Sequence, residues 1–173
     1  MASNRALIKE NFVFEGVTRS NEKCVFISHK KEDEAAAKYI GDYIMEHANV
    51  DIYLDLYDTE LKEAVSTEND KKIVESIKRG LRTSTHILCV ISDKTHLSWW
   101  VPYEIGVASE NKKSIASLKL KNISDLPSFL KTEQVLMTST DFVGYVDKLN
   151  PFHIISESMM HNSSKQGLKQ YLH

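Results

Sequence analysis

Short apolar runs alternate with amphipathic segments along most of this chain, and this alternation most constrains its fold. The runs at 23–28, 50–55 and 86–92 are rich in β-branched and aromatic residues, which predicts three strands. Weaker runs at 114–118 and 134–137 predict a fourth and a fifth strand. The first run is apolar at successive positions, as in parallel strands that are covered on both faces.

The segments between these runs have the periodicity of helices. In residues 33–47, Ala36, Ile40 and Ile44 recur at every fourth position, and residues 71–82 repeat the pattern. Further helices are predicted near 98–108, at 125–131 and 140–149, and in the tail at 164–172. Alternating strands and helices joined by right-handed crossovers predict an α/β fold, an open parallel five-stranded sheet in a flavodoxin-like three-layer sandwich.

The length of 173 residues fits a single domain with a sizeable core. We expect an N-terminal extension at 1–22, the domain at 23–150, and a C-terminal tail at 151–173 that packs on the domain. The net charge of -2, without a long basic run, gives no reason to expect nucleic acid as a partner. Apolar runs are too short to cross a bilayer, and residues 1–21 lack the apolar stretch of a secretory signal, so we expect a cytoplasmic protein without a membrane partner.

The cysteines bear on the cellular compartment, and the histidines bear on metal binding. Cys24 and Cys89 each lie inside a predicted strand, so we expect buried, reduced thiols, which favours a cytosolic setting. The seven histidines lack the spacing of a zinc site, so no metal is expected.

Polar side chains follow the predicted strands at one edge of the sheet. Ser28, His29 and Lys30 end the first strand, Asp55 ends the second, and Ser92 ends the third. Ligands of open parallel sheets bind beyond the carboxyl ends of the strands, where the strand order reverses. These residues therefore predict a cleft for a polar ligand with phosphates, although neither GxGxxG nor a Walker A lysine loop is present.

The segment after the third strand contains a helix start. Pro102 lacks a backbone N–H and fits only the first turn, so the helix begins near Ser98, a plausible N-cap. Glu104 then lies about one turn inside, where the helix dipole favours its ionised form. Trp100 lies on the same face, four residues earlier, and we expect Trp99 to pack inward. Taken alone, a glutamate at this position is usually solvated and not catalytic.

Three segments together resemble the signature regions of TIR domains. They are CVFISHKKED at 24–33, DIYLDLYD at 51–58 and SWWVPYEIGVA at 98–108. The resemblance spans about residues 23–149 and is greatest to bacterial stand-alone TIR proteins, which include the Thoeris anti-phage sensors. The third region is the most specific, because Trp100 and Glu104 match the WxxxE pattern of NAD-cleaving TIR enzymes.

This resemblance implies roles for the residues at the strand ends. Glu104 is the catalytic glutamate, and Ser28, His29 and Lys30 match the loop that contacts nicotinamide and its ribose. Asp55, Ser92 and Trp100 complete the expected substrate-binding set because of their places around the predicted cleft, independently of the resemblance. Residues 58–70 correspond to a loop that closes over the site and takes part in self-association, although this stretch lacks the glycine or proline common there.

The implied chemistry uses NAD+ as a substrate and needs no cofactor. Nicotinamide is a pyridinium and leaves as a neutral ring, while the ribose becomes oxocarbenium-like, as in glycoside hydrolysis. One fixed carboxylate suffices to stabilise that cation. Capture by water gives ADP-ribose, capture by the adenine of the same molecule gives a cyclic product, and a third acceptor gives a conjugate.

The leading hypothesis is therefore an NAD+ nucleosidase of TIR type in bacterial anti-phage defence. It is expected to be a homo-oligomer whose product activates a separate effector protein. The alternative is a non-catalytic TIR adaptor that acts through TIR–TIR self-association and does not need Glu104. A flavodoxin-like response module is a weaker reading, because Glu32 and Asp33 lie too far past the strand to bind magnesium; Asp33 is expected to be a first-turn acid of the following helix.

Overall fold

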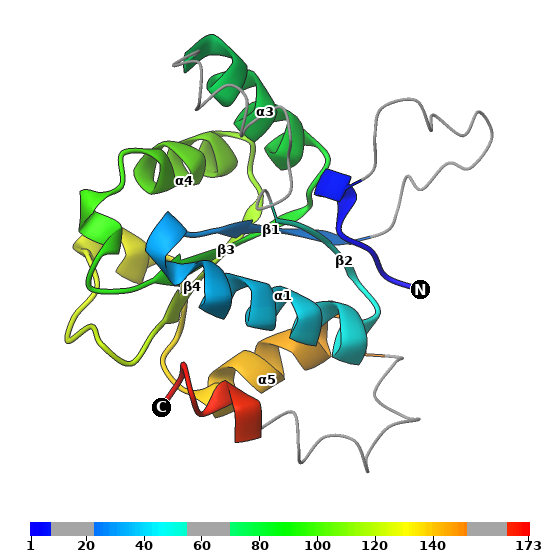
Figure 1. The fold of residues 1–173 in the computed structure, drawn as a ribbon, viewed down its shortest axis with the longest axis vertical. Coiled ribbons are helices and arrows are strands. Elements are labelled where there is room, and N and C mark those ends of the chain that lie inside the picture. The colour runs from blue at the N-terminus through cyan, green and yellow to red at the C-terminus, as the bar shows by residue number, and fades with distance from the viewer. Residues whose placement is uncertain (8–22, 55–69, 152–165) are drawn as a thin grey trace.

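The computed structural model describes residues 1–7, 23–54, 70–151 and 166–173, and these build a parallel sheet with helices on both faces (Figure 1). The strands are β1 (Cys24–Ser28), β2 (Asp51–Tyr53), β3 (His86–Ile91), β4 (Ser114–Lys119) and β5 (Gln134–Leu136). The α-helices are α1 (Glu34–Ala48), α3 (Asp70–Arg82), α4 (Trp100–Glu110) and α5 (Ser139–Leu149). Short 3-10 segments are η1 (Arg5–Leu7), η2 (Lys31–Asp33), η4 (Thr95–Leu97) and η5 (Ser128–Thr132). The predicted α/β class with a five-stranded parallel sheet is confirmed.

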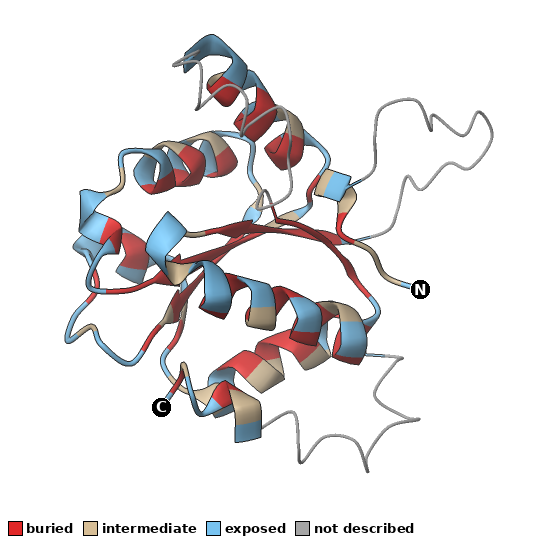
Figure 2. Cartoon of the chain, viewed as in Figure 1, coloured by how far each residue is buried: buried red, intermediate tan, exposed pale blue. Residues whose placement is uncertain are grey.

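The sheet divides the interior into two apolar layers. Helices α1 and α5 cover one face, and α3 and α4 cover the other (Figure 1). Along β1, Val25 and Ile27 belong to the first layer, while Cys24 and Phe26 belong to the second. Every residue of β1 is buried, and Figure 2 shows the same burial along the central strands. The prediction of a strand covered on both faces is confirmed.

The strand order β2-β1-β3-β4-β5 places β1 and β3 side by side at the centre of the sheet. The chain passes from β1 to the edge strand β2 and then returns past β1 to form β3. Ser28 pairs with Cys89 in the parallel register of β1 and β3. The carboxyl ends of these two strands are therefore neighbours at the point where the strand order reverses.

Most element boundaries lie within one or two residues of the sequence prediction, and the differences at η5 and at the start of α5 have local reasons. The helix expected at 125–131 is instead the 3-10 segment η5, because Pro127 before it has extended backbone, with φ -51° and ψ 143°. Helix α5 begins one residue earlier than expected, at Ser139. There Thr138 and Asp141 form a reciprocal capping box that satisfies backbone N–H groups at the start of the helix.

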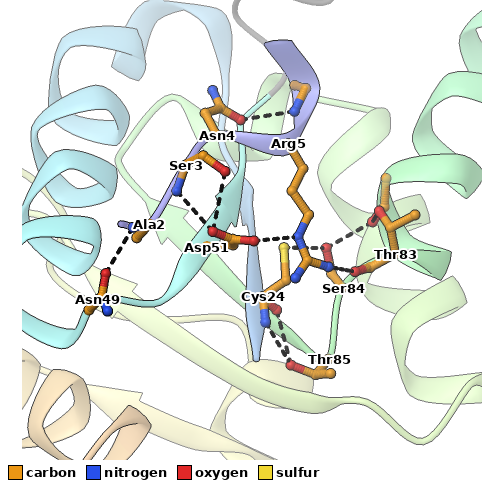
Figure 3. Close-up of polar contacts among 12 residues, drawn as sticks. Ala2, Ser3, Asn4, Arg5, Cys24, Asn49, Asp51, Thr83, Ser84 and Thr85 are labelled. Carbon is orange, nitrogen blue, oxygen red and sulfur yellow. Dashed lines mark hydrogen bonds and ion pairs between the residues drawn. The ribbon is translucent and has the colours of Figure 1, made fainter. Parts of the chain in front are cut away.

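Residues 2–5 lie along the outer edge of β2 (Figure 3). The Ile52 N–H donates to the Ser3 carbonyl at 3.1 Å. The Asn4 side chain donates to the Leu54 carbonyl and accepts from the Leu54 N–H, both at 3.0 Å. Arg5 Nε lies 2.9 Å from Asp51 Oδ2, and its Nη1 donates to the Thr83 carbonyl. These contacts tie the start of the chain to the sheet edge and to the connection after α3.

The last residues of the chain pack on the face covered by α1 and α5. Leu168 and Leu172 are fully buried in that layer. The ring of Tyr171 lies 5.7 Å from that of Tyr39, and the Ser139 N–H donates to the His173 carbonyl. In the described part of the chain, no helix is both long and apolar enough to cross a membrane.

Candidate active site

Ser28 and Glu104 meet at the carboxyl end of β1. The Ser28 hydroxyl donates a hydrogen bond of 2.5 Å to Glu104 Oε2. Ser28 is 1% exposed and Glu104 is 5% exposed, so the contact lies inside the protein. The structure thus brings together Ser28 from the end of the first predicted strand and Glu104 from the helix after the third, and the interpretation of Glu104 as a solvated helix residue is wrong.

The local sequence explains why α4 presents Glu104 inward. The helix begins at Trp100 with Pro102 as its third residue, and the Ser98 hydroxyl accepts the Val101 N–H at 3.3 Å. Val101 is buried on the inward side of the helix, as is Glu104. Because Glu104 is the fifth residue of α4, it lies just beyond the turn where the helix dipole acts most strongly. The Ser28 hydroxyl is therefore a more direct source of stabilisation for this carboxylate.

Cys89 lies on β3 beside this pair and remains a thiol. Burial raises the pKa of the Cys89 thiol strongly, and the nearby charge of Glu104 raises it further. Cys24 and Cys89 are both buried, so the prediction that these thiols lie inside the protein is confirmed. A neutral, buried thiol is a poor nucleophile, so the carboxylate is the chemically useful group at this position.

His29 and Lys30 follow Ser28 in the loop at the same sheet edge, and both are partly buried. His29 Nδ1 lies 3.3 Å from the Ile27 carbonyl, which helps to orient the imidazole. Lys30 Nζ lies 3.3 Å from Glu32 Oε1, and that glutamate is half exposed. An ion pair with such an exposed partner is weak, so the ammonium can exchange it for an anionic ligand.

Ser92 lies at the end of β3, but its hydroxyl is committed to another residue. Ser92 Oγ donates to Asp33 Oδ2 at 2.6 Å and accepts the Lys94 N–H at 3.1 Å. The sequence analysis placed Asp33 only as a first-turn acid of α1 and missed this pairing. The signal that could have found it is an acid and a hydroxyl in the loops after two adjacent parallel strands.

The two tryptophans at the start of α4 behave differently from each other. Trp100 is 37% exposed and lies edge-on to Tyr103, with ring centroids 6.1 Å apart. Trp99 is 91% exposed, so the expectation that it packs inward is wrong. Trp99 precedes the first helical residue, and the inward side of α4 is filled by Val101 and Ile105.

Two of the predicted features lie outside the described residues. They are Asp55 and the expected closing loop at 58–70, of which only Asp70 is described, as the first residue of α3.

A cavity of about 660 Å³ opens between the start of α4 and the chain after β4, and Ser92 at the end of β3 also lines it. Its walls include Val101, Pro102 and Ile105 from the helix, and Leu126 and Phe129 from the opposite segment. Ser28 and Glu104 do not line this cavity. Within the described residues, no group of three or more histidine, cysteine or acidic side chains is arranged to hold a metal ion.

Comparison with known proteins identifies the family. A family model described as TIR domain matches residues 25–149. The fold is similar to the crystal structure of the TIR domain of the Toll-related receptor TRR-2 from Hydra magnipapillata, with a TM-score of 0.50 and 16% sequence identity over 64% of this chain and 82% of that chain. No curated protein matches the sequence. Since the family model covers more than half of its length, the chain belongs to the TIR domain family.

Proposed function

We propose that this TIR domain protein cleaves the bond between nicotinamide and ribose in NAD+, with Glu104 as the catalytic residue. The observation that supports this proposal is the burial of Glu104 against Ser28 at the tip of β1. Burying a carboxylate costs free energy that an apolar residue at the same place would not. A buried acid at the edge where ligands bind in such sheets therefore favours a functional role.

The proposed reaction places one demand on the protein. The nicotinamide leaves as a neutral ring, and positive charge develops on the ribose carbon that it leaves. The Glu104 carboxylate stabilises that charge, and the Ser28 hydroxyl holds the carboxylate in one orientation so that little rearrangement is needed. Lys30 supplies a positive charge for the pyrophosphate and His29 a further hydrogen-bonding group.

The proposal extends to the product of the reaction and to its biological role. The ribosyl cation is captured by water to give ADP-ribose, or by another acceptor to give a cyclic or conjugated signal. The WxxxE pattern at Trp100 and Glu104 supports the cleavage reaction itself. The proposed setting, anti-phage defence of the Thoeris kind in which homo-oligomers make a signal for a separate effector, rests on the resemblance to bacterial stand-alone TIR proteins.

A non-catalytic adaptor is the second candidate, and one surface feature favours it. Leu97 is 62% exposed and Trp99 is 91% exposed at the start of α4, with Trp100 beside them. Large apolar side chains exposed together are typical of protein contact surfaces. An adaptor would use this surface and would have no need of a buried carboxylate at residue 104.

The deciding experiment incubates the purified chain with NAD+ over a wide range of protein concentrations. Nicotinamide release is followed, and a mass spectrum identifies the product. Glu104→Gln is expected to lower turnover by about a hundredfold or more while the melting temperature stays similar. Glu110→Gln removes an exposed carboxylate from the end of the same helix and is expected to leave turnover unchanged.

The outcomes separate the two candidates. Turnover that rises faster than protein concentration supports assembly-dependent catalysis. Undiminished turnover by Glu104→Gln contradicts the catalytic role. Absence of nicotinamide release at every concentration, together with self-association that Glu104→Gln does not change, supports the adaptor instead.

A further inference from the structure

Asp33 lies at the N-cap position of α1, but its carboxylate binds a distant serine and does not cap the helix. It is the last residue of η2 and the N-cap of α1, and it makes no side-chain capping bond. Aspartate is among the preferred N-cap residues because its carboxylate accepts backbone N–H groups. Here Asp33 Oδ2 instead accepts a 2.6 Å hydrogen bond from Ser92, a residue 59 positions away.

Asp33 also holds its own loop through the main chain. Its N–H donates to the Lys30 carbonyl at 2.8 Å. One residue therefore binds the loop after β1 through its backbone and the loop after β3 through its carboxylate. The first of these loops begins next to Ser28, and the second leads to the helix that carries Glu104.

The loop after β3 continues this series of hydrogen bonds into α4. The Ser92 N–H donates to Thr95 Oγ1 at 2.9 Å, and the Ser98 N–H donates to the Thr95 carbonyl at 2.9 Å. The Ser98 hydroxyl then accepts the Val101 N–H in the first turn of α4. The Ser92 hydroxyl has a single proton, which it donates to Asp33, while its oxygen accepts the Lys94 N–H. Ser92 is buried, so water does not readily replace these partners.

We propose that Asp33 is a positioning residue for the Ser28–Glu104 pair. Its carboxylate links the loop after β1 to the loop that starts α4, and this link sets where the Glu104 carboxylate lies relative to the bound ribose. The inference rests on the proposed function for its catalytic consequence. The hydrogen bonds themselves do not depend on that function.

The kinetic test uses Asp33→Ala, Asp33→Asn and Ser92→Ala, each assayed well below its own melting temperature so that the unfolded fraction is negligible. Asp33→Ala is expected to lower kcat about tenfold to a hundredfold, since small misplacements of a catalytic group cost that much. Asp33→Asn is expected to restore most of kcat, because the amide oxygen accepts the same bond from Ser92. The double variant Asp33→Ala with Ser92→Ala is expected to be no worse than either single variant.

The control is Glu34→Gln, which removes an exposed negative charge from the neighbouring residue and is expected to leave kcat unchanged. A purely structural role for Asp33 would lower the melting temperatures but not kcat of the folded protein. Full activity of Asp33→Ala in the folded state, or failure of Asp33→Asn to recover activity, would overturn the proposal.

A second readout needs no turnover. The side-chain carboxyl carbon of Glu104 can be observed by 13C NMR and assigned by its loss in Glu104→Gln. It is expected to shift in Asp33→Ala and Ser92→Ala and to stay in place in Glu34→Gln. If the unaltered protein releases no nicotinamide, the proposed function fails, and this resonance still tests the positioning. A Glu104 resonance that does not move in Asp33→Ala would overturn the proposal that Asp33 positions Glu104.

Discussion

Ser28 and Glu104, 76 positions apart in the chain, share a 2.5 Å hydrogen bond where β1 meets α4. Both residues are buried, so bulk water does not readily replace either partner. The strength of this contact should therefore be visible in stability as well as in catalysis.

Replacement of Ser28 by alanine tests both effects. Ser28→Ala removes the donor to a buried carboxylate, so we expect the free energy of unfolding to fall by about 1–3 kcal/mol. NAD+ cleavage should fall by about tenfold or more because the carboxylate loses its fixed orientation. Urea unfolding and nicotinamide release measure the two quantities.

Ser117→Ala is the matched control for that variant. Ser117 is fully buried on β4, and its hydroxyl has no hydrogen-bond partner among the described residues. Its loss should change the free energy of unfolding by less than about 0.5 kcal/mol or raise it slightly. Equal losses of stability in the two variants would show that the hydrogen bond from Ser28 to Glu104 does not contribute to the free energy of unfolding.

Arg5 should stabilise the edge of the sheet. Its guanidinium contacts the buried Asp51 carboxylate and the Thr83 carbonyl, and it joins the start of the chain to β2 and to the end of α3 (Figure 3). Arg5→Ala is expected to lower the free energy of unfolding by about 1–3 kcal/mol, since it leaves a buried charged group with fewer partners. Lys38→Ala breaks an exposed pair with Asp42 and is expected to cost less than about 0.5 kcal/mol. Similar melting temperatures for both variants would contradict a structural role for the N-terminal residues.

The raised pKa of the buried Tyr43 side chain predicts that the protein loses stability at alkaline pH. Burial raises the pKa of Tyr43 to about 12, whereas an unfolded tyrosine ionises near its ordinary value of about 10. Between these values the folded state holds more protons than the unfolded state, so the free energy of unfolding falls as the pH rises. Its contribution to stability is fully present below about pH 10.

Tyr43→Phe should make that alkaline decline shallower. The Tyr43 hydroxyl is buried and has no hydrogen-bond partner in the described part of the protein, so its removal should leave stability at neutral pH unchanged or higher. Urea unfolding between pH 7 and pH 12 compares the two proteins. A decline of the same steepness in Tyr43→Phe would exclude Tyr43 as its source.

Several features of the candidate site could be predicted without coordinates. The periodicity of apolar residues reports which side of an element is buried, so the strand β1 and the helices α1 and α3 were predicted within one or two residues. The missing N–H of Pro102 located the start of α4 within about two residues and placed Glu104 about one turn inside that helix, whereas the burial of Glu104 against Ser28 is known only from the structure.

Other features depend on pairings that local patterns do not encode. Asp33 turns away from its own helix to Ser92, and Asn4 pairs with Leu54 across 50 positions, because the parallel order of the strands brings those backbones together. Trp99 is exposed because the residues after it fill the inward side of α4.

The amino-acid sequence by itself determined the elements, their buried faces and the strand ends at which polar groups gather, because each of these follows from the chemistry of neighbouring residues. Only the tertiary structure decided which of those polar groups touch. A hydrogen bond between distant residues is set by strand order and register, and these arise from the packing of the whole sheet and its helices.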